Sequence, residues 1–262
     1  MSLKLDDYEK VIFEKSPLNE VVCQLRFHQI LKIAGTPPAE FQDQVRDTFP
    51  VFGEERGIQF GVAGTQPVIT TPEPVWQLKT PDELWAVSLN SSFVALKTFA
   101  YQDFDDFLKL ALPVIAAFEA VYAPPFYVRV GLRYVNRWVL PKPPNGRVEW
   151  ERYLNSHLAG MFSDTALEGA IAEARHDVVL NADRGQIGWR YSRDVGESEG
   201  EPAEQFTLDF DHYAAGQVKC SDVESLLTSF NDNAFRLFRW CLTEDGYKTL
   251  EPRSKNEKEG AQ

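Results

Sequence analysis

FYVRVGLRYVNRWVL, residues 126–140, alternates between apolar and charged side chains over most of its length. Successive side chains of an extended strand point to opposite faces. One face then carries Val128, Val130, Leu132, Tyr134, Asn136 and Trp138. The other face carries Arg129, Gly131, Arg133, Val135 and Arg137, which places three guanidinium groups four residues apart. We predict a central antiparallel strand with one face on the core and a charged face that carboxylates, water or an anionic ligand must complement.

A second strand of the same character lies near the N-terminus. Residues 20–28, EVVCQLRFH, place Val21, Cys23, Leu25 and Phe27 on one face. The opposite face is mostly polar and carries Glu20, Val22, Gln24, Arg26 and His28. This alternation is typical of a half-buried strand. If the two strands are neighbours, they form one candidate ligand-binding face with Arg129, Arg133, Arg137, Gln24, Arg26, His28 and Glu20.

Two long amphipathic helices are expected to cover the apolar faces. Residues 104–122 repeat apolar side chains at helical spacing, and Asp103 is placed to cap their first turn. Residues 221–242 repeat the pattern after a capping box that begins at Ser221, and Gly246 fits a C-terminal stop. Strands and helices without regular βαβ alternation indicate an α+β fold with a mainly antiparallel sheet.

The chain divides at PKPPNG, residues 141–146, into two halves with a similar order of elements. Residues 1–140 form an N-terminal α+β half and residues 148–250 a C-terminal α+β half, each covered on one face by a long helix. This order indicates an internal repeat, although residue identity between the halves is slight. We expect the halves to form one compact unit and residues 251–262 to be a disordered tail.

Weaker patterns indicate the secondary structure of three segments in the second half. A helix is expected around residues 149–162, whereas residues 167–180 fit either a helix or a strand. The run DVGESEGEPAE, residues 194–204, is expected to be an acidic mobile loop. The following strand, QFTLDFD, points Phe206, Leu208 and Phe210 inward and Asp209 and Asp211 outward.

The composition is that of a water-soluble protein. The chain has 262 residues, 44% of them hydrophobic and 25% charged, which suffices for one large domain or two small ones. Its formal charge of −12 opposes non-specific binding to nucleic acid. No apolar run reaches the length of a membrane span, and the N-terminus lacks the apolar core of a signal peptide. Because Cys23, Cys220 and Cys241 form no CxxC pair, we expect reduced thiols and a cytoplasmic location.

Two segments resemble the signatures of a known family. PLNEVVCQLRF, residues 17–27, and RVGLRYVNRW, residues 129–138, resemble the paired motifs of a sporadically distributed bacterial protein family of unknown function. The likeness extends to chain length and to the placing of the two long helices, and so covers roughly residues 10–245. The resemblance implies a bacterial origin but no activity, cofactor or substrate, and it transfers no catalytic residue.

The arginines of residues 126–140 have two interpretations. Arg129, Arg133 and Arg137 could bind a phosphate, a nucleotide or an acidic partner segment, because guanidinium groups suit such anions. They could instead pair with carboxylates such as Glu20 or Asp209 on neighbouring strands. The structural interpretation is favoured, because ion-pair networks are commoner than ligand sites.

Other chemistry has little support in the sequence. Asp209, Asp211 and His212 are a weak candidate for a divalent metal, because two acids on one strand face more often pair with arginine or water. The chain contains no HExxH, CxxC or GxSxG motif and no phosphate-binding loop. No cofactor is predicted.

Two functions therefore remain open. The first is a non-enzymatic binding or interaction protein, able to form homo-oligomers, that meets an anionic small molecule or a protein partner with its arginine-lined sheet face or its sheet edges. The second is a metal-dependent enzyme or binder acting on a phosphorylated small molecule in a tunnel-like antiparallel sheet. The second would require acidic and basic side chains at alternate positions of the opening strand, where the chain has Glu20, Val22 and Gln24. The first is favoured.

Overall fold

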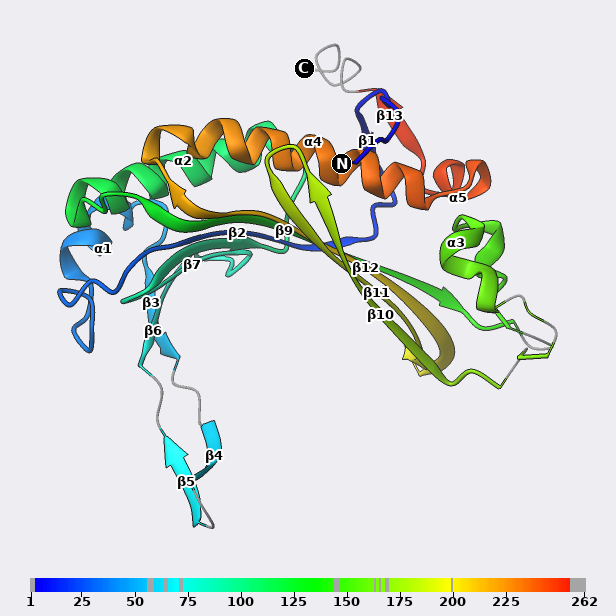
Figure 1. Cartoon of the computed structure of the whole chain (residues 1–262), viewed down its shortest axis with the longest axis horizontal. Helices are drawn as coiled ribbons and strands as arrows, with labels where there is room; N and C mark the ends of the chain where they lie inside the picture. Colours follow the sequence, from blue (N-terminus) through cyan, green and yellow to red (C-terminus); the bar gives the residue numbers. More distant parts are fainter. Residues whose placement is uncertain are drawn as a thin grey trace. The chain divides into compact units, whose positions relative to one another are not determined.

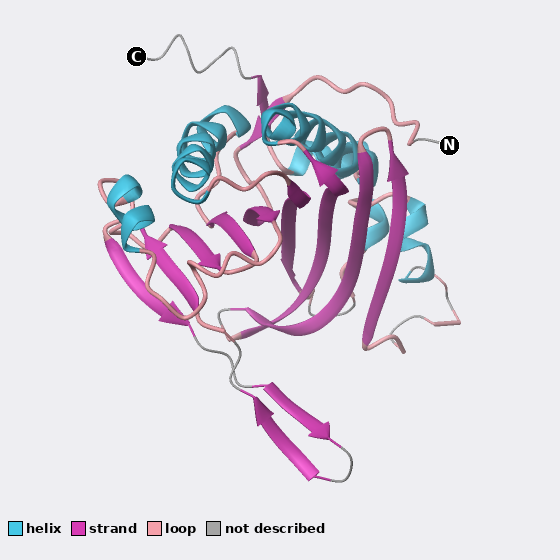
Figure 2. Cartoon of the chain, turned by 60° about the vertical axis from the view of Figure 1, so that its left-hand side comes forward, coloured by secondary structure: helices cyan, strands magenta, loops and turns pink. Residues whose placement is uncertain are grey.

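The structure is a computed structural model that describes residues 3–55, 59–63, 66–70, 73–143, 147–162, 164, 166–167, 170–198 and 200–254. Strands make up a larger share of the described residues than helices do (Figures 1 and 2). The strands are β1 (Val11–Phe13), β2 (Leu18–Arg26), β3 (Val51–Glu55), β4 (Gln59–Ala63), β5 (Gln66–Thr70), β6 (Val75–Lys79), β7 (Trp85–Asn90), β8 (Phe93–Thr98), β9 (Tyr127–Pro141), β10 (Glu173–Ala182), β11 (Gly185–Ser198), β12 (Glu201–Val218) and β13 (Pro252–Ser254). The α-helices are α1 (Ala39–Val45), α2 (Phe104–Tyr122), α3 (Ser156–Ala159), α4 (Val223–Cys241) and α5 (Glu244–Thr249). Short 3-10 turns are η1 (Trp150–Arg152), η2 (Gly160–Phe162) and η3 (Cys220–Asp222).

The principal sheet is antiparallel, with the strand order β10-β11-β12-β9-β2-β8-β7-β6-β3. Two further pairs, β1-β13 and β4-β5, form separate two-stranded sheets. This architecture confirms the predicted α+β class and the central strand at residues 126–140. No described helix combines the length and the apolar character that crossing a membrane requires.

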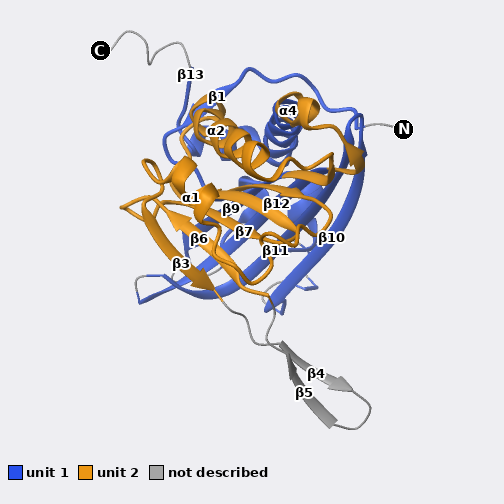
Figure 3. Ribbon diagram, turned by 90° about the vertical axis from the view of Figure 1, so that its left-hand side faces the viewer, with its two compact units in different colours: residues 1–20, 132–213, 227–262 blue, residues 21–131, 214–226 orange. Residues whose placement is uncertain are grey.

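Two compact units divide the chain, and each combines segments that are distant in the sequence (Figure 3). Unit 1 consists of residues 1–20, 132–213 and 227–262, and unit 2 of residues 21–131 and 214–226. The expectation of two similar halves is not confirmed. Each unit boundary falls within an element, namely β2, β9, β12 or α4. The PKPPNG segment, residues 141–146, lies inside unit 1 and does not separate these units.

Unit 2 places α2 along one face of its strands (Figure 1). The side chain of Asp103 accepts a hydrogen bond from the backbone N–H of Asp106 at 2.9 Å, which confirms the predicted N-cap. The buried ring of Phe118 on α2 lies with its centroid 4.7 Å from that of Phe27, directly after β2. The apolar face of residues 20–28 is therefore buried as the alternation predicts.

Unit 1 packs the C-terminal part of α4 against the apolar face of its own strands. The buried hydroxyl of Tyr134 on β9 donates a hydrogen bond to Oδ1 of Asn231 on α4 at 2.9 Å. On β12, alternate side chains are buried beneath the helix, and the ring centroid of His212 lies 4.0 Å from that of Phe230. The opposite face of β9, β11 and β12 carries the charged side chains of Arg133, Arg190 and Asp209.

The predicted helix around residues 149–162 is wrong in length. The chain forms only η1, α3 and η2 there. Asn155 explains the interruption, because its Oδ1 accepts hydrogen bonds from the backbone N–H groups of His157 and Leu158 and so begins a new helix. Its Nδ2 also donates to the carbonyl of Trp240 at 2.7 Å. Of the ambiguous segment 167–180, the residues from Glu173 onward form a strand.

The predicted mobile loop at residues 194–204 is also wrong. The hairpin of β11 and β12 continues through this segment, in register from Asp194 opposite Gln205 to Ser198 opposite Glu201. Gly200 has a φ of 83°, which a turn of this kind requires. The acidic composition misled the prediction because cross-strand pairing satisfies the backbone groups that a solvated loop would leave to water.

The C-terminal end differs from the prediction in two places. Helix α4 ends at Cys241, and Gly246 lies inside the separate helix α5, which Thr243 caps by accepting a hydrogen bond from the Gly246 N–H at 3.0 Å. The expected tail 251–262 is ordered at its start, where Pro252–Ser254 pair with β1 as β13. The rest of that tail, residues 255–262, lies outside the described residues.

Gly246 is packed so closely against the main chain that replacing it should lower the stability of the protein. A Cβ at this position would lie 2.0 Å from the backbone oxygen of Tyr153, so the main chain itself would have to move. We expect Gly246→Ala to lower the free energy of unfolding by about 1–3 kcal/mol, the usual cost of overpacking, in urea denaturation. Gly160→Ala is the control, because no atom lies within 4 Å of its added Cβ and its φ is −55°. Equal stability of the two variants would contradict the prediction.

Candidate anion-binding site

Three strands of unit 1 bring two arginines and one aspartate to the polar sheet face. Arg190 on β11 stands directly opposite Asp209 on β12 in the antiparallel register. Arg133 on β9 reaches the same carboxylate. Side chains directly opposite each other on antiparallel strands share a face, so the pairing of β11 with β12 determines where Arg190 lies. We call Arg133, Arg190 and Asp209 the arginine–aspartate cluster.

The geometry of the cluster is that of one carboxylate held by two guanidinium groups. Arg133 binds Asp209 in a bidentate manner, with Nε 2.7 Å from Oδ1 and Nη2 2.8 Å from Oδ2. Arg190 places its Nε 3.1 Å from Oδ2 of the same carboxylate. The side chain of Asp209 is only 8% exposed, whereas those of Arg133 and Arg190 are 39% and 48% exposed. The carboxylate therefore orients two cations that remain accessible to solvent.

Electrostatic interactions favour the charged form of Arg133. The hydrogen bond to Asp209 raises the pKa of the Arg133 guanidinium, and burial offsets part of this increase. The negative charges of Asp209, Asp211 and Glu20 raise that pKa further. Two cations therefore share one buried anion, with two more carboxylates close enough to moderate the positive potential.

The structure brings together only some of the residues that the sequence selected. Arg133 and Asp209 meet, and Glu20 is close enough to act on Arg133 electrostatically. The exposed side chain of Arg137 lies on the same strand face as Arg133, and among the described residues it has no ion-pair partner. The sequence analysis missed Arg190, although its alternation with Trp189 already places it on the polar face of β11.

The other residues that the sequence selected for the site belong to unit 2. Gln24 is half-buried opposite Ala95, and Arg26 is exposed opposite Phe93. The exposed His28 makes an edge-to-face contact with Phe126, at 5.6 Å between ring centroids. The guanidinium of Arg129 folds over the backbone of the neighbouring glycine, because a Cβ at Gly131 would lie 2.5 Å from its Nη1. Gly131 thus leaves room for this side chain to lie flat on the strand.

Comparison of the chain with protein-family models and with curated proteins finds no match. The resemblance of residues 17–27 and 129–138 to the bacterial family therefore stays a prediction that rests on the two motifs. What the site can bind has to be inferred from its own geometry and charge.

The three residues of the weak metal candidate do not lie on the same face of the sheet. Asp209 and Asp211 point to the polar face of β12, whereas His212 points to the opposite face and is completely buried. Both oxygens of Asp209 already accept hydrogen bonds or ion pairs from arginines. In the described part of the chain, no group of three or more His, Cys, Asp and Glu side chains is placed to hold a metal ion.

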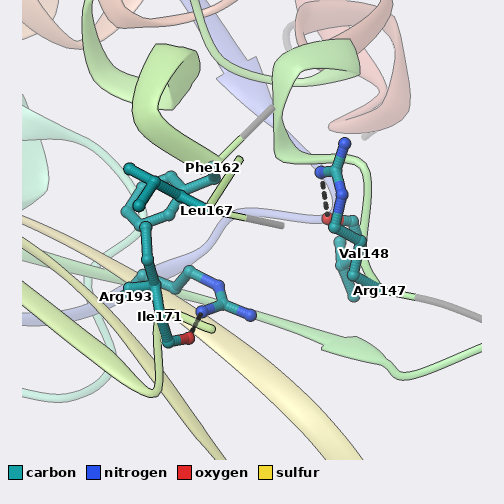
Figure 4. A pocket seen from close by; sticks show the side chains of 6 residues that line it. All are labelled: Arg147, Val148, Phe162, Leu167, Ile171 and Arg193. Carbon is teal, nitrogen blue, oxygen red and sulfur yellow. Dashed lines mark hydrogen bonds between the residues drawn. The ribbon is translucent and has the colours of Figure 1, made fainter. Parts of the chain in front are cut away.

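Unit 1 also contains a small pocket that is partly open to solvent (Figure 4). It is lined by Arg147, Val148, Phe162, Leu167, Ile171 and Arg193. Its cations are already occupied: Arg147 pairs with Glu151, and Arg193 pairs with the buried Glu204 and donates to the Ile171 carbonyl at 2.6 Å. The arginine–aspartate cluster, whose cations share a single carboxylate, is the better candidate for binding an anion.

Proposed function

We propose that the chain is a non-enzymatic binding protein that holds an anionic group of a small molecule or a protein partner between Arg133 and Arg190. The decisive observation is that a single buried carboxylate orients both guanidinium groups while they stay 39% and 48% exposed. A guanidinium has five N–H donors. Asp209 engages two nitrogens of Arg133 and the Nε of Arg190, so each arginine keeps donors for a ligand.

The charges around the cluster indicate which anion it selects. A carboxylate or a single phosphate matches the planar fork of guanidinium donors. The nearby negative charges of Glu20 and Asp211 oppose a polyanion, as does the formal charge of −12 on the whole chain. The site therefore suits one small anionic group, and nucleic acid is not its ligand.

No observation favours the metal-dependent alternative. Asp209, which would be a principal oxygen ligand, is neutralised by the two arginines of the cluster. A divalent cation at this position would have to displace at least one of them against its own positive charge.

The proposal is tested by binding of inorganic phosphate and of acetate, each a single small anionic group, to the full chain. A ligand that binds the native state raises the unfolding temperature. We expect both anions to do so at millimolar concentration in the wild-type chain. Arg190→Gln should weaken binding at least about tenfold, because it removes charge-assisted hydrogen bonds but leaves the bidentate pair of Arg133 and Asp209 in place.

Arg253→Gln is the matched control, since Arg253 is 63% exposed and pairs with Glu14 at 2.7 Å in a different part of unit 1. It should bind both anions as the wild type does. The proposal is overturned if neither anion raises the unfolding temperature of the wild type, or if Arg190→Gln and Arg253→Gln bind equally well. A response to acetate alone would identify a carboxylate rather than a phosphate as the recognised group.

A further inference from the structure

Strand β10 lies at the end of the strand order of the principal sheet. It has ten residues and pairs with β11 in unbroken antiparallel register, from Glu173 opposite Asp194 to Ala182 opposite Gly185. Among the described residues no strand pairs with its other side, and Figure 3 shows β10 at the margin of unit 1. We call this side the β10 edge. Its outward N–H and C=O groups are available to a further strand.

The β10 edge carries charged side chains at Glu173, Arg175 and Asp177, but it lacks other features that usually prevent strands from pairing with another chain. Sheet edges are commonly protected by proline, lysine, a bulge or a very short strand. β10 contains none of these, and Val178, Val179 and Leu180 form an uncharged run in which Val179 is 64% exposed. At the other end of the strand order, β3 has only five residues and carries Glu54 and Glu55. Of these two ends of the principal sheet, β10 is therefore the better suited to accept a further strand.

We propose that the β10 edge pairs antiparallel with the β10 edge of a second copy of this chain, with His176 of one copy opposite His176 of the other. A two-fold axis perpendicular to the sheet keeps each side chain on the same face of the sheet. An odd-numbered residue can therefore stand opposite only an odd-numbered residue of the other copy, and an even-numbered residue opposite only an even-numbered one. This register places Arg175 of each copy opposite Asp177 of the other, which gives two identical cross-strand charge pairs.

Neighbouring registers lack this complementarity or overlap less. An axis at Ala174 would also oppose Glu173 to Arg175, but it would pair only residues 173–175 of each β10. A two-fold axis at Asp177 would place two carboxylates opposite each other, and an axis at Arg175 would place two guanidinium groups opposite each other. An axis at Val178 would oppose Asp177 to Val179 without any charge pair. The Arg175 side chain is 71% exposed, and it contacts Glu173 at 2.6 Å and Asp194 only at 4.0 Å, so it can reach a second copy.

A charge exchange at the β10 edge tests the proposal by analytical ultracentrifugation of the full chain. We expect the wild type to be a dimer at micromolar concentration. Asp177→Arg and Arg175→Asp should each raise the dissociation constant of the dimer at least about tenfold. Each substitution places like charges opposite each other, and the two-fold axis repeats this repulsive contact. The double variant Arg175→Asp, Asp177→Arg restores opposite charges and should restore the dimer.

Asp47→Arg is the matched control, because it makes the same change of charge at an exposed position outside β10. It should leave the dimer intact, and circular dichroism should show that every variant is folded. A monomeric wild type overturns the proposal. So does a dimer that Asp177→Arg leaves unchanged, or a double variant that stays as weak as the single variants.

Discussion

Glu204→Gln is expected to lower the free energy of unfolding by about 3–5 kcal/mol, the usual cost of breaking a buried ion pair by removing one partner. Glu204 is completely buried, and its Oε2 lies 3.0 Å from Nε and 2.9 Å from Nη2 of Arg193. The same oxygen accepts a hydrogen bond from the indole nitrogen of Trp150 at 3.0 Å. The glutamine removes the negative charge but leaves Arg193, which is 7% exposed, inside the protein without a counter-charge. Urea denaturation monitored by tryptophan fluorescence measures the loss.

Glu151→Gln is the matched control for this prediction. It removes the partner of Arg147 in another ion pair of unit 1, but the Glu151 side chain is 34% exposed. We expect it to cost less than about 1 kcal/mol, because water can solvate a partly exposed arginine. The double variant Arg193→Met, Glu204→Met should recover much of the stability, since apolar residues of similar size often replace a buried pair at little cost. Similar losses for Glu204→Gln and Glu151→Gln would contradict this account.

This buried pair shows where prediction from the sequence ends. Residues 194–204 are rich in acids and glycine, and local composition favoured a solvated loop. Glu204 is buried only because β12 pairs with β11 and because Trp150 and Arg193 come from distant parts of the chain. Such partners depend on strand register, which is a property of the folded chain and not of any short window.

The elements with strong local signals were predictable. The alternation of residues 126–140 identified β9, and the apolar repeat after Asp103 identified α2 with its cap. The signals failed where two residues far apart in the sequence approach each other. Gly246 was assigned to the end of a helix because glycine is common there, yet it lies against the backbone of Tyr153.

In the candidate site, too, the sequence predicted what depends on local alternation but not which distant residues meet. The sequence selected Arg133 and Asp209 from alternation on their separate strands, and their contact is a finding of the structure. Arg190 was missed because nothing in QIGWRYSR shows which residue of β12 will stand opposite it. His212 was grouped with Asp209 by closeness in sequence, although a shift of an odd number of residues along a strand moves a side chain to the other face.

His212 leads to the second large expected effect, a loss of stability in mild acid. Its side chain is completely buried, and neither ring nitrogen makes a hydrogen bond of good geometry within the described structure, although a weaker interaction with the Phe230 backbone opposes the lowering of its pKa. Burial lowers its pKa from 6.5 to about 4. The unfolded chain therefore takes up a proton near pH 6.5 that the folded chain does not accept until about pH 4.

The sign of the pH dependence follows from this difference. The contribution of neutral His212 is complete above pH 6.5, and it decreases as the pH falls from 6.5 to about 4 because the unfolded state binds more protons. The total loss amounts to about 3 kcal/mol, at up to about 1.4 kcal/mol per pH unit. Denaturation between pH 6.5 and 5 measures it best, because most carboxylates titrate below that range.

A variant without the imidazole separates His212 from all other titrating groups. His212→Leu keeps an apolar side chain beside Phe230, and its stability should vary less with pH than that of the wild type by up to about 1.4 kcal/mol per pH unit. His157→Leu is the matched control, because it makes the same chemical change at an exposed histidine stacked on Trp240. Parallel losses in the wild type and His212→Leu would show that the buried imidazole is not the group that acid protonates.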